Sequence, residues 1–242
     1  MRCLDLHTHI LPGVDDGAQT VEESIQLLTA MKEQGITDVV ATPHFDATHH
    51  NLPDFIERIR SAYREVQNAA AGLDLPHVFV GSEVFYFNGI GKSNGIRVLS
   101  MGGSRYFLLE LPGCKLDKQI IADIVGLREN LRLIPILAHI ERYAGQRGFK
   151  EVLKLIESGV ALGQINATSL VEPHTKRLVL KLIKKNAVSF VATDSHSPDT
   201  RPPRMQEGLQ VVADTFGENQ RHIFIANSDH ICQKLKDTIY EE

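Results

Sequence analysis

The sequence contains no tryptophan and only three cysteines, Cys3, Cys114 and Cys232, among its 242 residues. Three is an odd number, and these cysteines lack the close spacing of a zinc finger. We therefore expect neither a disulfide framework nor a structural zinc site. A reducing cytoplasm is the expected location, and the cysteines are interpreted as structural.

The chain also lacks a net positive charge and long apolar runs. A formal net charge of -4 and a pI near 6.3 give no broad basic surface, so we expect no nucleic-acid partner. No apolar run approaches the roughly 20 residues that span a bilayer, which argues against membrane insertion. Asp5 and His7 lie where a signal peptide would begin its basic and apolar segments, so none is expected.

Short apolar runs alternate with longer segments of helical spacing along the whole chain. This alternation predicts an α/β protein of roughly seven or eight strand-helix units, and the length fits one domain over residues 1–242. The predicted strands are Cys3–Leu6, Asp38–Ala41, Val78–Gly81, Phe107–Leu111, Ile134–Ala138, Ala161–Ile165, Ser189–Ala192 and Ile223–Ala226. The predicted helices are Val21–Gln34, Pro53–Ala71, Lys118–Asn130, Phe149–Ser158, Thr175–Asn186 and Pro203–Phe216.

Three local patterns refine this prediction. Thr20 followed by Glu23 resembles a capping box, and Gly35 is placed to end the first helix. The segment Asn88–Gly103 is rich in glycine and asparagine and shows little periodicity. We expect an irregular excursion near the mouth of the barrel there.

Side chains of metal-ligand type follow nearly every predicted strand. They are His7 and His9, His44, Glu83, Glu110, His139, and finally Asp194 with His196. In an α/β barrel the C-terminal strand ends converge on one mouth. A single histidine would more often be a hydrogen-bonded barrel residue. The joint placement favours a site, because buried histidines and carboxylates are costly to desolvate and need partners such as a metal.

The donor types indicate which metals would suit this mouth. Residues two apart in an extended segment point to the same side, so His7 with His9 and Asp194 with His196 can each serve a common site. Imidazole and carboxylate without thiolate favour zinc, manganese or iron. A shared carboxylate allows two-metal chemistry, and Glu83 is the candidate bridge. The histidines interpreted as nonligands are His49, His50, His77, His174, His222 and His230.

Two arginines follow ligand-type residues on the same loops. Arg142 comes after His139, and Arg201 comes after His196. A guanidinium fork matches phosphate oxygens, so both are candidates for phosphate binding rather than solvated surface charges. Arg147 and Arg204 lie further along their loops and are weaker candidates, while Tyr143 could stack or pack.

The motifs LDLHTHILPGVDDG, ATPH, GSEV, LLEL, AHIERY and ATDSHS resemble the PHP superfamily. The nearest resemblance is to its bacterial branch of CpsB/YwqE-like manganese-dependent tyrosine-protein phosphatases, from the first strand to at least Arg204. This resemblance implies a distorted (β/α)7 TIM-like barrel that binds up to three divalent ions. Mn²⁺ is preferred through the resemblance alone, and Zn²⁺ or Fe are alternatives.

The resemblance also implies three sets of metal ligands. The first set is His7, His9, Glu83 and Asp194; the second is Glu83, Glu110 and His139; the third is Asp16, His44 and His196. Spacing alone does not decide between Asp15 and Asp16, and the family pattern selects Asp16. Glu110 and Asp16 stand where histidinol-phosphate phosphatases of the superfamily typically carry histidines, which points to the tyrosine-phosphatase branch.

The implied function is hydrolysis of phosphotyrosine on the tail of a bacterial tyrosine autokinase in capsule or exopolysaccharide biosynthesis. Our mechanistic hypothesis is direct attack on phosphorus by a metal-activated hydroxide, with Arg142 and Arg201 holding the phosphate. A cysteine mechanism is disfavoured, because Cys114 lies in PGCKLDK without a phosphate-cradling loop and arginine.

Three alternative functions and the oligomeric state stay open at this point. The same barrel could hydrolyse a small phosphate ester such as histidinol phosphate, although Glu110 and the HILPGVDDG opening count against it. It could also be a noncatalytic regulatory barrel, although no ligand position is lost. An amidohydrolase would commonly need a bridging lysine, and no lysine stands at a predicted strand end. The sequence does not indicate the oligomeric state.

Overall fold

The computed structural model describes residues 2–113 and 115–236, in which strands alternate with helices. The strands are β1 (Leu4–Thr8), β2 (Asp38–Ala41), β3 (His44–Phe45), β4 (His77–Val80), β5 (Glu83–Phe85), β6 (Tyr106–Glu110), β7 (Ile134–Leu137), β8 (Leu162–Asn166) and β9 (Phe190–Ala192). The α-helices are α1 (Val21–Glu33), α2 (Leu52–Ala70), α3 (Lys118–Glu129), α4 (Phe149–Glu157), α5 (Ala167–Val171), α6 (Pro173–Lys184), α7 (Met205–Phe216) and α8 (Glu218–Cys232). Cys114 lies outside the described residues, so the structural role expected for it is not addressed.

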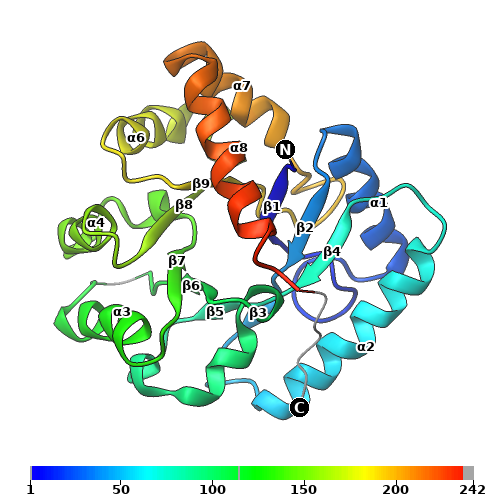
Figure 1. Cartoon of the computed structure of the whole chain (residues 1–242), viewed down its shortest axis with the longest axis horizontal. Helices are drawn as coiled ribbons and strands as arrows, with labels where there is room; N and C mark the ends of the chain where they lie inside the picture. Colours follow the sequence, from blue (N-terminus) through cyan, green and yellow to red (C-terminus); the bar gives the residue numbers. More distant parts are fainter. Residues whose placement is uncertain (1, 114, 237–242) are drawn as a thin grey trace.

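All the strand pairs between named strands are parallel, and the strands form a curled sheet with helices around it (Figure 1). One sheet has the order β1-β2-β4 and the other the order β3-β5-β6-β7-β8-β9. A parallel bridge between Thr8 and Ser195 joins the end of β1 to the segment after β9. The expected α/β fold with a parallel sheet is therefore confirmed, and the sheet curls back toward its first strand.

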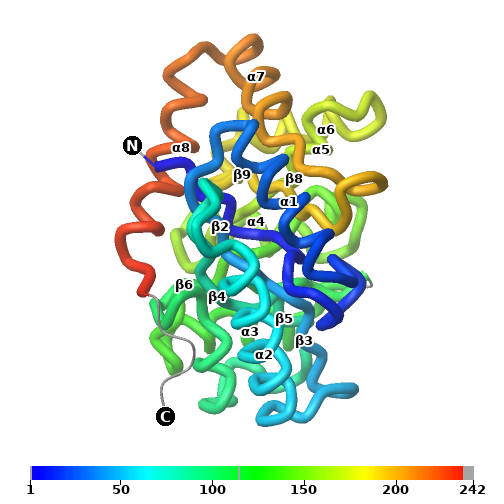
Figure 2. The backbone as a smooth tube through the Cα atoms, turned by 90° about the vertical axis from the view of Figure 1, so that its right-hand side faces the viewer, coloured from blue at the N-terminus to red at the C-terminus, as the bar shows by residue number. Residues whose placement is uncertain are grey.

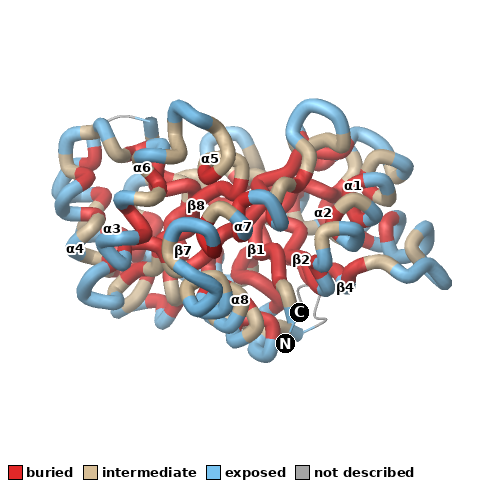
Figure 3. The backbone as a smooth tube through the Cα atoms, turned by 90° about the horizontal axis from the view of Figure 1, so that it is seen from above, coloured by how far each residue is buried: buried red, intermediate tan, exposed pale blue. Residues whose placement is uncertain are grey.

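The side chains inside this curled sheet change character along each strand. Leu108 and Ala192 belong to a buried apolar cluster, and two residues later come Glu110 and Asp194. Because side chains alternate between the two faces of a strand, residues two apart share the inner face. The N-terminal ends of the strands are therefore filled by apolar side chains and the C-terminal ends by titratable ones. Figure 3 shows the strands as a buried layer beneath exposed helix surfaces and loops.

The predicted strand Ile223–Ala226 is wrong, because these residues lie within helix α8. The buried residues of α8 are Phe224, Ser228, Ile231 and Cys232, which follow helical spacing, whereas Ile223 is exposed. A short apolar run does not distinguish a strand from a half-buried helix. Ile231 and Cys232 pack against Leu4 and Leu6, so the end of α8 covers the N-terminal ends of the strands. Figure 2 shows α8 on one side of the molecule and the loop that follows β1 on the other.

The excursion Asn88–Gly103 forms three short 3₁₀ helices, Ile90–Lys92, Asn94–Leu99 and Met101–Gly103. It was expected near the mouth, but its last part lies at the opposite end, where Met101 joins the apolar cluster of Leu4 and Leu6. The reason is that parallel β5 and β6 require the chain to return to the starting end of the sheet.

The predicted ends of the first helix are confirmed. The Thr20 hydroxyl accepts a hydrogen bond from the Glu23 amide at 3.2 Å, and Gly35 has a φ of +77° after the last turn. Helix α1 therefore begins directly after the loop that follows β1 and ends shortly before β2. Within the part of the chain that the structure describes, no helix has the length and apolar character needed to cross a bilayer.

Candidate metal centre

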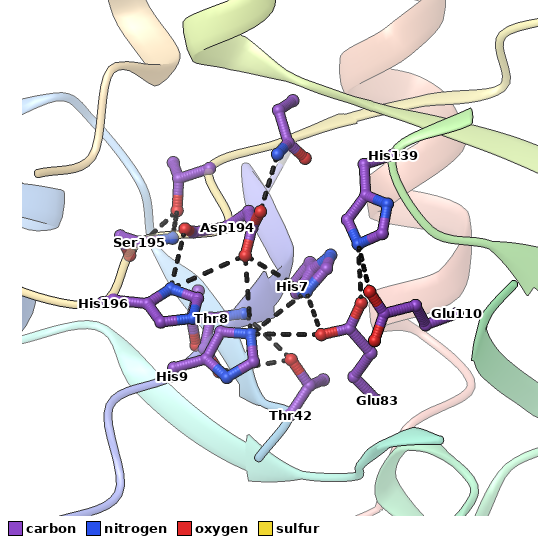
Figure 4. A network of polar contacts seen from close by, with 12 residues as sticks. His7, Thr8, His9, Thr42, Glu83, Glu110, His139, Asp194, Ser195 and His196 are labelled. Atoms are coloured by element: carbon purple, nitrogen blue, oxygen red, sulfur yellow. Dashed lines mark hydrogen bonds and ion pairs between the residues drawn. The ribbon is translucent and has the colours of Figure 1, made fainter. Parts of the chain in front are cut away.

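The nine residues proposed as metal ligands from the sequence gather at the C-terminal ends of the strands. Seven of them are labelled in Figure 4, where Glu83 lies between two histidines on one side and His139 with Glu110 on the other. Within the described residues, three groups have ligand atoms within 4.8 Å of one another. The groups are His7, His9 and Asp194; His44, Glu83 and Glu110; and His9, Asp16, His44 and His196.

In the first group, two histidine rings present the same type of atom to each other. The Nε2 atoms of His7 and His9 lie 3.1 Å apart, and both are 3.5 Å from Oδ1 of Asp194. Two bare imidazole nitrogens would repel at this distance unless a proton or a metal cation lies between or beside them. The two rings and the carboxylate are buried, so the geometry fits one shared cation.

Glu83 is the residue that connects the groups. Its Oε2 is 3.0 Å from Nε2 of His7 and 3.1 Å from Nδ1 of His44. Its Oε1 is 2.9 Å from Nε2 of His139. The carboxylate is fully buried, and each of its oxygens faces a different set of imidazoles. This arrangement is that of a carboxylate able to bridge two cations, which is the role expected for Glu83.

The third group contains a buried nitrogen without a partner. Nδ1 of His196 lies 3.0 Å from the main-chain oxygen of Asp194, and donates its proton there. Nε2 of His196 is buried and has no hydrogen-bond partner, although Oδ1 of Asp16 lies 3.5 Å from it. A buried polar atom without a partner carries a desolvation cost of about 1–3 kcal/mol. A metal ion at this lone pair, with Asp16 and His44 nearby, would remove that cost.

Asp15 and Asp16 have different environments. Oδ2 of Asp15 accepts from Nδ1 of His9 at 2.7 Å and from the main-chain amide of His44 at 3.0 Å. Oδ1 of Asp15 accepts from the Gly17 amide at 2.9 Å. Asp15 therefore orients His9 and its loop, whereas the side chain of Asp16 is 67% exposed and its Oδ1 lies 3.5 Å from Nε2 of His44 and from Nε2 of His196. The choice of Asp16 as the ligand remains a prediction, and this geometry is consistent with it.

Gly17 is required by how closely its loop approaches His9. A Cβ atom at this position would lie 2.1 Å from the main-chain oxygen of His9. The Ala18 amide donates to that same oxygen at 2.9 Å, which holds the loop against the end of β1. The loop therefore needs a residue without a side chain at this point.

The charges of the cluster shift its pKa values strongly. Burial would raise the pKa of Asp194, but His7 and His9 outweigh it and hold this pKa well below its ordinary value. Burial and the Glu83 carboxylate raise the pKa of Glu110 to about 7. Burial and nearby His9 lower the pKa of His196 to about 4, so its imidazole is neutral at neutral pH. Such shifts are typical of functional sites.

Two of the proposed ligands have strained backbones. His139 has a φ of +31° and Asp194 a φ of +52°, in the left-handed region that favours glycine. A backbone conformation of this kind is unfavourable by about 1–3 kcal/mol, and it is kept only where the surrounding structure enforces it. At both positions the turn directs a strand-end side chain into the cluster, which links the strain to the site.

The two predicted arginines reach the edge of the cluster. Oδ2 of Asp194 accepts from Arg142 at 2.7 Å and lies 3.0 Å from Nη2 of Arg201. The arginine side chains are 47% and 41% exposed, so each presents a second edge to solvent. A cavity of about 470 Å³ opens there, lined in part by Arg142, Asp194 and Arg201. An anion in this cavity would meet both guanidinium groups beside the metal ligands.

The two weaker candidates, Arg204 and Arg147, have different surroundings. Arg204 lines the same cavity but pairs with Glu172 at 3.0 Å and with Glu207 at 2.6 Å. Arg147 lines a separate groove with Lys118 and Glu151. The guanidinium group of Arg204 is therefore already paired with two carboxylates, and Arg147 lies in a different groove from the proposed ligands.

Tyr143 and strand β8 have roles that the sequence reasoning missed. The Tyr143 hydroxyl lies 3.2 Å from Nδ1 of His139 and accepts from the Leu111 amide at 3.0 Å, so it holds this imidazole in place. On β8, Gln164 and Asn166 are buried beside His7 and Asp194. The available signal was two polar residues with a spacing of two in an otherwise apolar strand.

The donor set fits divalent cations. The three groups offer imidazole nitrogens and carboxylate oxygens only, which suits zinc, manganese or iron. None of the six histidines interpreted as nonligands joins such a group within residues 2–113 and 115–236. Cys3 and Cys232 are free thiols at the other end of the strands.

The fold and the cluster define a class of protein, an α/β barrel-like fold with a cluster of histidines and carboxylates able to hold metal ions at its C-terminal strand ends. Within that class the chain belongs to the CpsB/CapC family of capsular polysaccharide synthesis, whose family model matches residues 3–233. It is 31% identical to the tyrosine-protein phosphatase YwqE of Bacillus subtilis, over 99% of this chain and 94% of that protein. The family resemblance found in the sequence motifs is confirmed.

Solved structures agree with this assignment. A structure from work on YwqE of Bacillus subtilis and CpsB of Streptococcus pneumoniae, described as unique metal-dependent tyrosine phosphatases, superposes with a TM-score of 0.84. Identity is 28%, and 97% of this chain and 96% of that chain are covered. A histidinol phosphate phosphatase of Lactococcus lactis, with zinc, L-histidinol and phosphate, gives a TM-score of 0.57 at 14% identity, over 90% of this chain and 94% of that one. The second likeness concerns the fold alone.

Proposed function

We propose that this protein is a metal-dependent protein-tyrosine phosphatase of a capsule or exopolysaccharide system. The observation that carries the proposal is the position of Asp194. Its Oδ1 faces the histidines of the cluster, while its Oδ2 meets Arg142 and Arg201. Two guanidinium groups able to bind phosphate therefore adjoin the proposed metal ligands, an arrangement that suits hydrolysis of a phosphate ester. The family and the names of the relatives support the substrate class.

The architecture that we propose is a single domain with a distorted (β/α)7 barrel of the PHP type. β3 begins three residues after β2 ends, and β5 begins three residues after β4 ends. If each pair is counted as one bent strand, the nine strands of the described residues reduce to seven. The bridge between Thr8 and Ser195 then closes the ring.

The nine proposed ligands would hold up to three divalent ions, with Mn²⁺ as the first choice and Zn²⁺ or Fe as alternatives. They are His7, His9, Asp16, His44, Glu83, Glu110, His139, Asp194 and His196. When bound, such ions supply a water of lowered pKa for attack on phosphorus and offset negative charge on the phosphate.

The protein's own groups bind and orient the ester. Arg142 and Arg201 would each donate from a guanidinium edge to phosphate oxygens, because their other edges are already held by Asp194. Their charge stabilises the phosphate as the tyrosyl oxygen departs. Glu83, fully buried between imidazoles, keeps the ligand groups at fixed separations.

The substrate that we propose is a phosphotyrosine-bearing tail of a bacterial tyrosine autokinase, dephosphorylated in the cytoplasm. The exposure of Asp16 and the half-exposed arginines leaves the mouth open to an extended segment. A flexible tail can bring a phosphorylated ring into such a mouth. A small ester would need no open approach of this kind.

The test is hydrolysis of a phosphotyrosine peptide by metal-stripped protein before and after addition of Mn²⁺. Histidinol phosphate and a phosphoserine peptide are measured in parallel under the same conditions. We expect manganese-dependent release of phosphate from the phosphotyrosine peptide alone. Preference for histidinol phosphate would assign the chain to small-ester hydrolysis. Inactivity on all three substrates with Mn²⁺, Zn²⁺ and Fe²⁺ would favour a noncatalytic barrel.

A further inference from the structure

Strand β8 contributes none of the proposed metal ligands, although it lies between β7 and β9, next to His139 and Asp194. Its inward residues are Gln164 and Asn166, which are 0% and 7% exposed. Burying two primary amides is costly unless each polar atom finds a partner. The hydrogen-bond partners of these two amides indicate what this strand contributes to the site.

The two amides connect two of the proposed ligands through consecutive hydrogen bonds. Oε1 of Gln164 lies 3.1 Å from Nδ1 of His7, and Nε2 of Gln164 donates to Oδ1 of Asn166 at 2.9 Å. Nδ2 of Asn166 then donates to Oδ2 of Asp194 at 2.6 Å. We call this chain from His7 to Asp194 the amide relay.

A main-chain group determines the direction of the amide relay. The amide of His139 donates to the same Gln164 oxygen at 2.8 Å, and a main-chain N–H can only donate. The side-chain atom that faces it must therefore be the oxygen, so Nδ1 of His7 must donate to this oxygen as well. The Gln164 nitrogen then points to Asn166, whose own nitrogen is left to donate to Asp194. Each step has one consistent assignment.

We infer that Gln164 and Asn166 are positioning residues that hold His7 and Asp194 in the form that binds a metal. A proton on Nδ1 of His7 leaves Nε2 as the coordinating nitrogen, and this atom faces His9 and Glu83. The bond to Oδ2 of Asp194 turns Oδ1 toward the same histidines. The inference rests on the proposed metal centre and adds to it residues that touch no metal.

The Nδ1 atoms of two other histidines in the cluster have different acceptors, so the amide relay is specific to His7. Nδ1 of His9 meets the Asp15 carboxylate at 2.7 Å, and Nδ1 of His196 meets a main-chain oxygen at 3.0 Å. His7 is held by a neutral amide whose orientation depends on a second amide. Loss of either amide should therefore affect the site containing His7 and Asp194 first.

The experiment measures Mn²⁺ affinity of metal-stripped protein from the electron paramagnetic resonance signal of free Mn²⁺. Gln164→Met keeps the length of the side chain but removes the acceptor for His7. We expect affinity at the tightest site to fall about 10- to 100-fold, the usual cost of losing a group that orients a ligand. Gln164→Glu retains an acceptor for His7 and the His139 amide but removes the donor to Asn166, so it should recover only part of that loss.

Asn166→Asp gives a second, independent variant if Gln164→Met fails to fold. It sets a carboxylate against Oδ2 of Asp194, where the native distance is 2.6 Å, and should also weaken Mn²⁺ binding. Asn227→Asp is the matched control, because this amide donates to the Ser189 oxygen at 3.0 Å, before β9 begins. Its Mn²⁺ affinity should equal that of the wild type.

A spectroscopic measurement distinguishes positioning from packing. In the Zn²⁺-loaded wild type, the buried Nδ1 proton of His7 should give a slowly exchanging downfield resonance, which Gln164→Met should lose. Wild-type affinity in both Gln164→Met and Asn166→Asp, with only a lower unfolding midpoint, would overturn the inference. If the wild type itself bound no Mn²⁺, Zn²⁺ or Fe²⁺, the result would contradict the proposed metal centre rather than the role of the amide relay.

Discussion

At the N-terminal ends of the strands, Leu4, Leu6 and Phe190 pack against Ile231 from helix α8. At the C-terminal ends of the same strands, His7, His9 and Asp194 face one another, with the Nε2 atoms of the two histidines 3.1 Å apart. The apolar end is closed by a helix, whereas the polar end is open to a cavity.

The difference between the two ends separates stability from function along one set of strands. Burial of apolar area at the closed end stabilises the fold by about 25 cal/mol per Å². The open end contains buried charges, strained turns at His139 and Asp194, and an unpartnered nitrogen on His196, all of which cost stability. Such a site is tolerated because the closed end stabilises the protein. A bound ligand would also provide partners for the charges and the nitrogen at the open end.

The largest effect expected at the open end comes from removing a proposed ligand. His9→Ala and Asp194→Ala should lower turnover of phosphotyrosine by about a thousandfold or more, because metal-ion catalysis supplies several kcal/mol and each 1.4 kcal/mol is tenfold. Circular dichroism should show that both variants remain folded. Full activity in both would contradict the assignment of these ligands.

At the closed end the largest effect should be on stability. Ile231→Ala leaves a cavity against Leu4 and Leu6 and should lower the free energy of unfolding by about 2–5 kcal/mol, measured by urea denaturation. Ile223 on the same helix is 49% exposed, so Ile223→Ala should change it by less than about 0.5 kcal/mol. Mn²⁺ affinity should stay at the wild-type value in both. A parallel loss of affinity would mean that the two ends are not separable.

The content of the open end could be predicted from the sequence, but its geometry could not. Glu110 and Asp194 follow apolar inward residues at a spacing of two, which is visible in the sequence. His139 departs from that spacing through its φ of +31°, and the pairing of β1 shifts between Asp5 and Thr8, just before His9. Spacing therefore identified which residues gather there but not how they face one another.

Other features depend on contacts between distant segments. Spacing alone did not distinguish Asp15 from Asp16, and the hydrogen bond from the His44 amide to Asp15 joins segments that are distant in the sequence. The segment Ile223–Ala226, predicted as a strand, belongs to α8, and one face of this helix packs over the closed end. Gln164 was not identified, because an amide's role depends on which atoms surround it rather than on its own chemistry.

A smaller effect at the open end is expected from the arginines. Arg142→Ala and Arg201→Ala should each lower kcat/KM for a phosphotyrosine peptide by about 10- to 100-fold, the effect of losing one hydrogen bond to a charged group. Mn²⁺ affinity should change little, since Asn166 still donates to Asp194. Arg147→Ala is the control, because Arg147 lines a separate groove. Equal losses in all three variants would indicate a general charge effect instead of phosphate binding.

The smallest effect on activity should come from the closed end, at Cys3. Burial raises the pKa of this thiol from 9.0 to about 11, which reduces its thiolate about a hundredfold at neutral pH. Cys3 should therefore react slowly with iodoacetamide in the folded protein and quickly in urea, as followed by mass spectrometry of the peptide that contains it. Cys3→Ala should retain wild-type turnover, because the thiol lies at the end of β1 remote from His7 and His9. Loss of turnover in this variant with unchanged stability would show that the closed end also contributes to the reaction, and the separation between the two ends would fail.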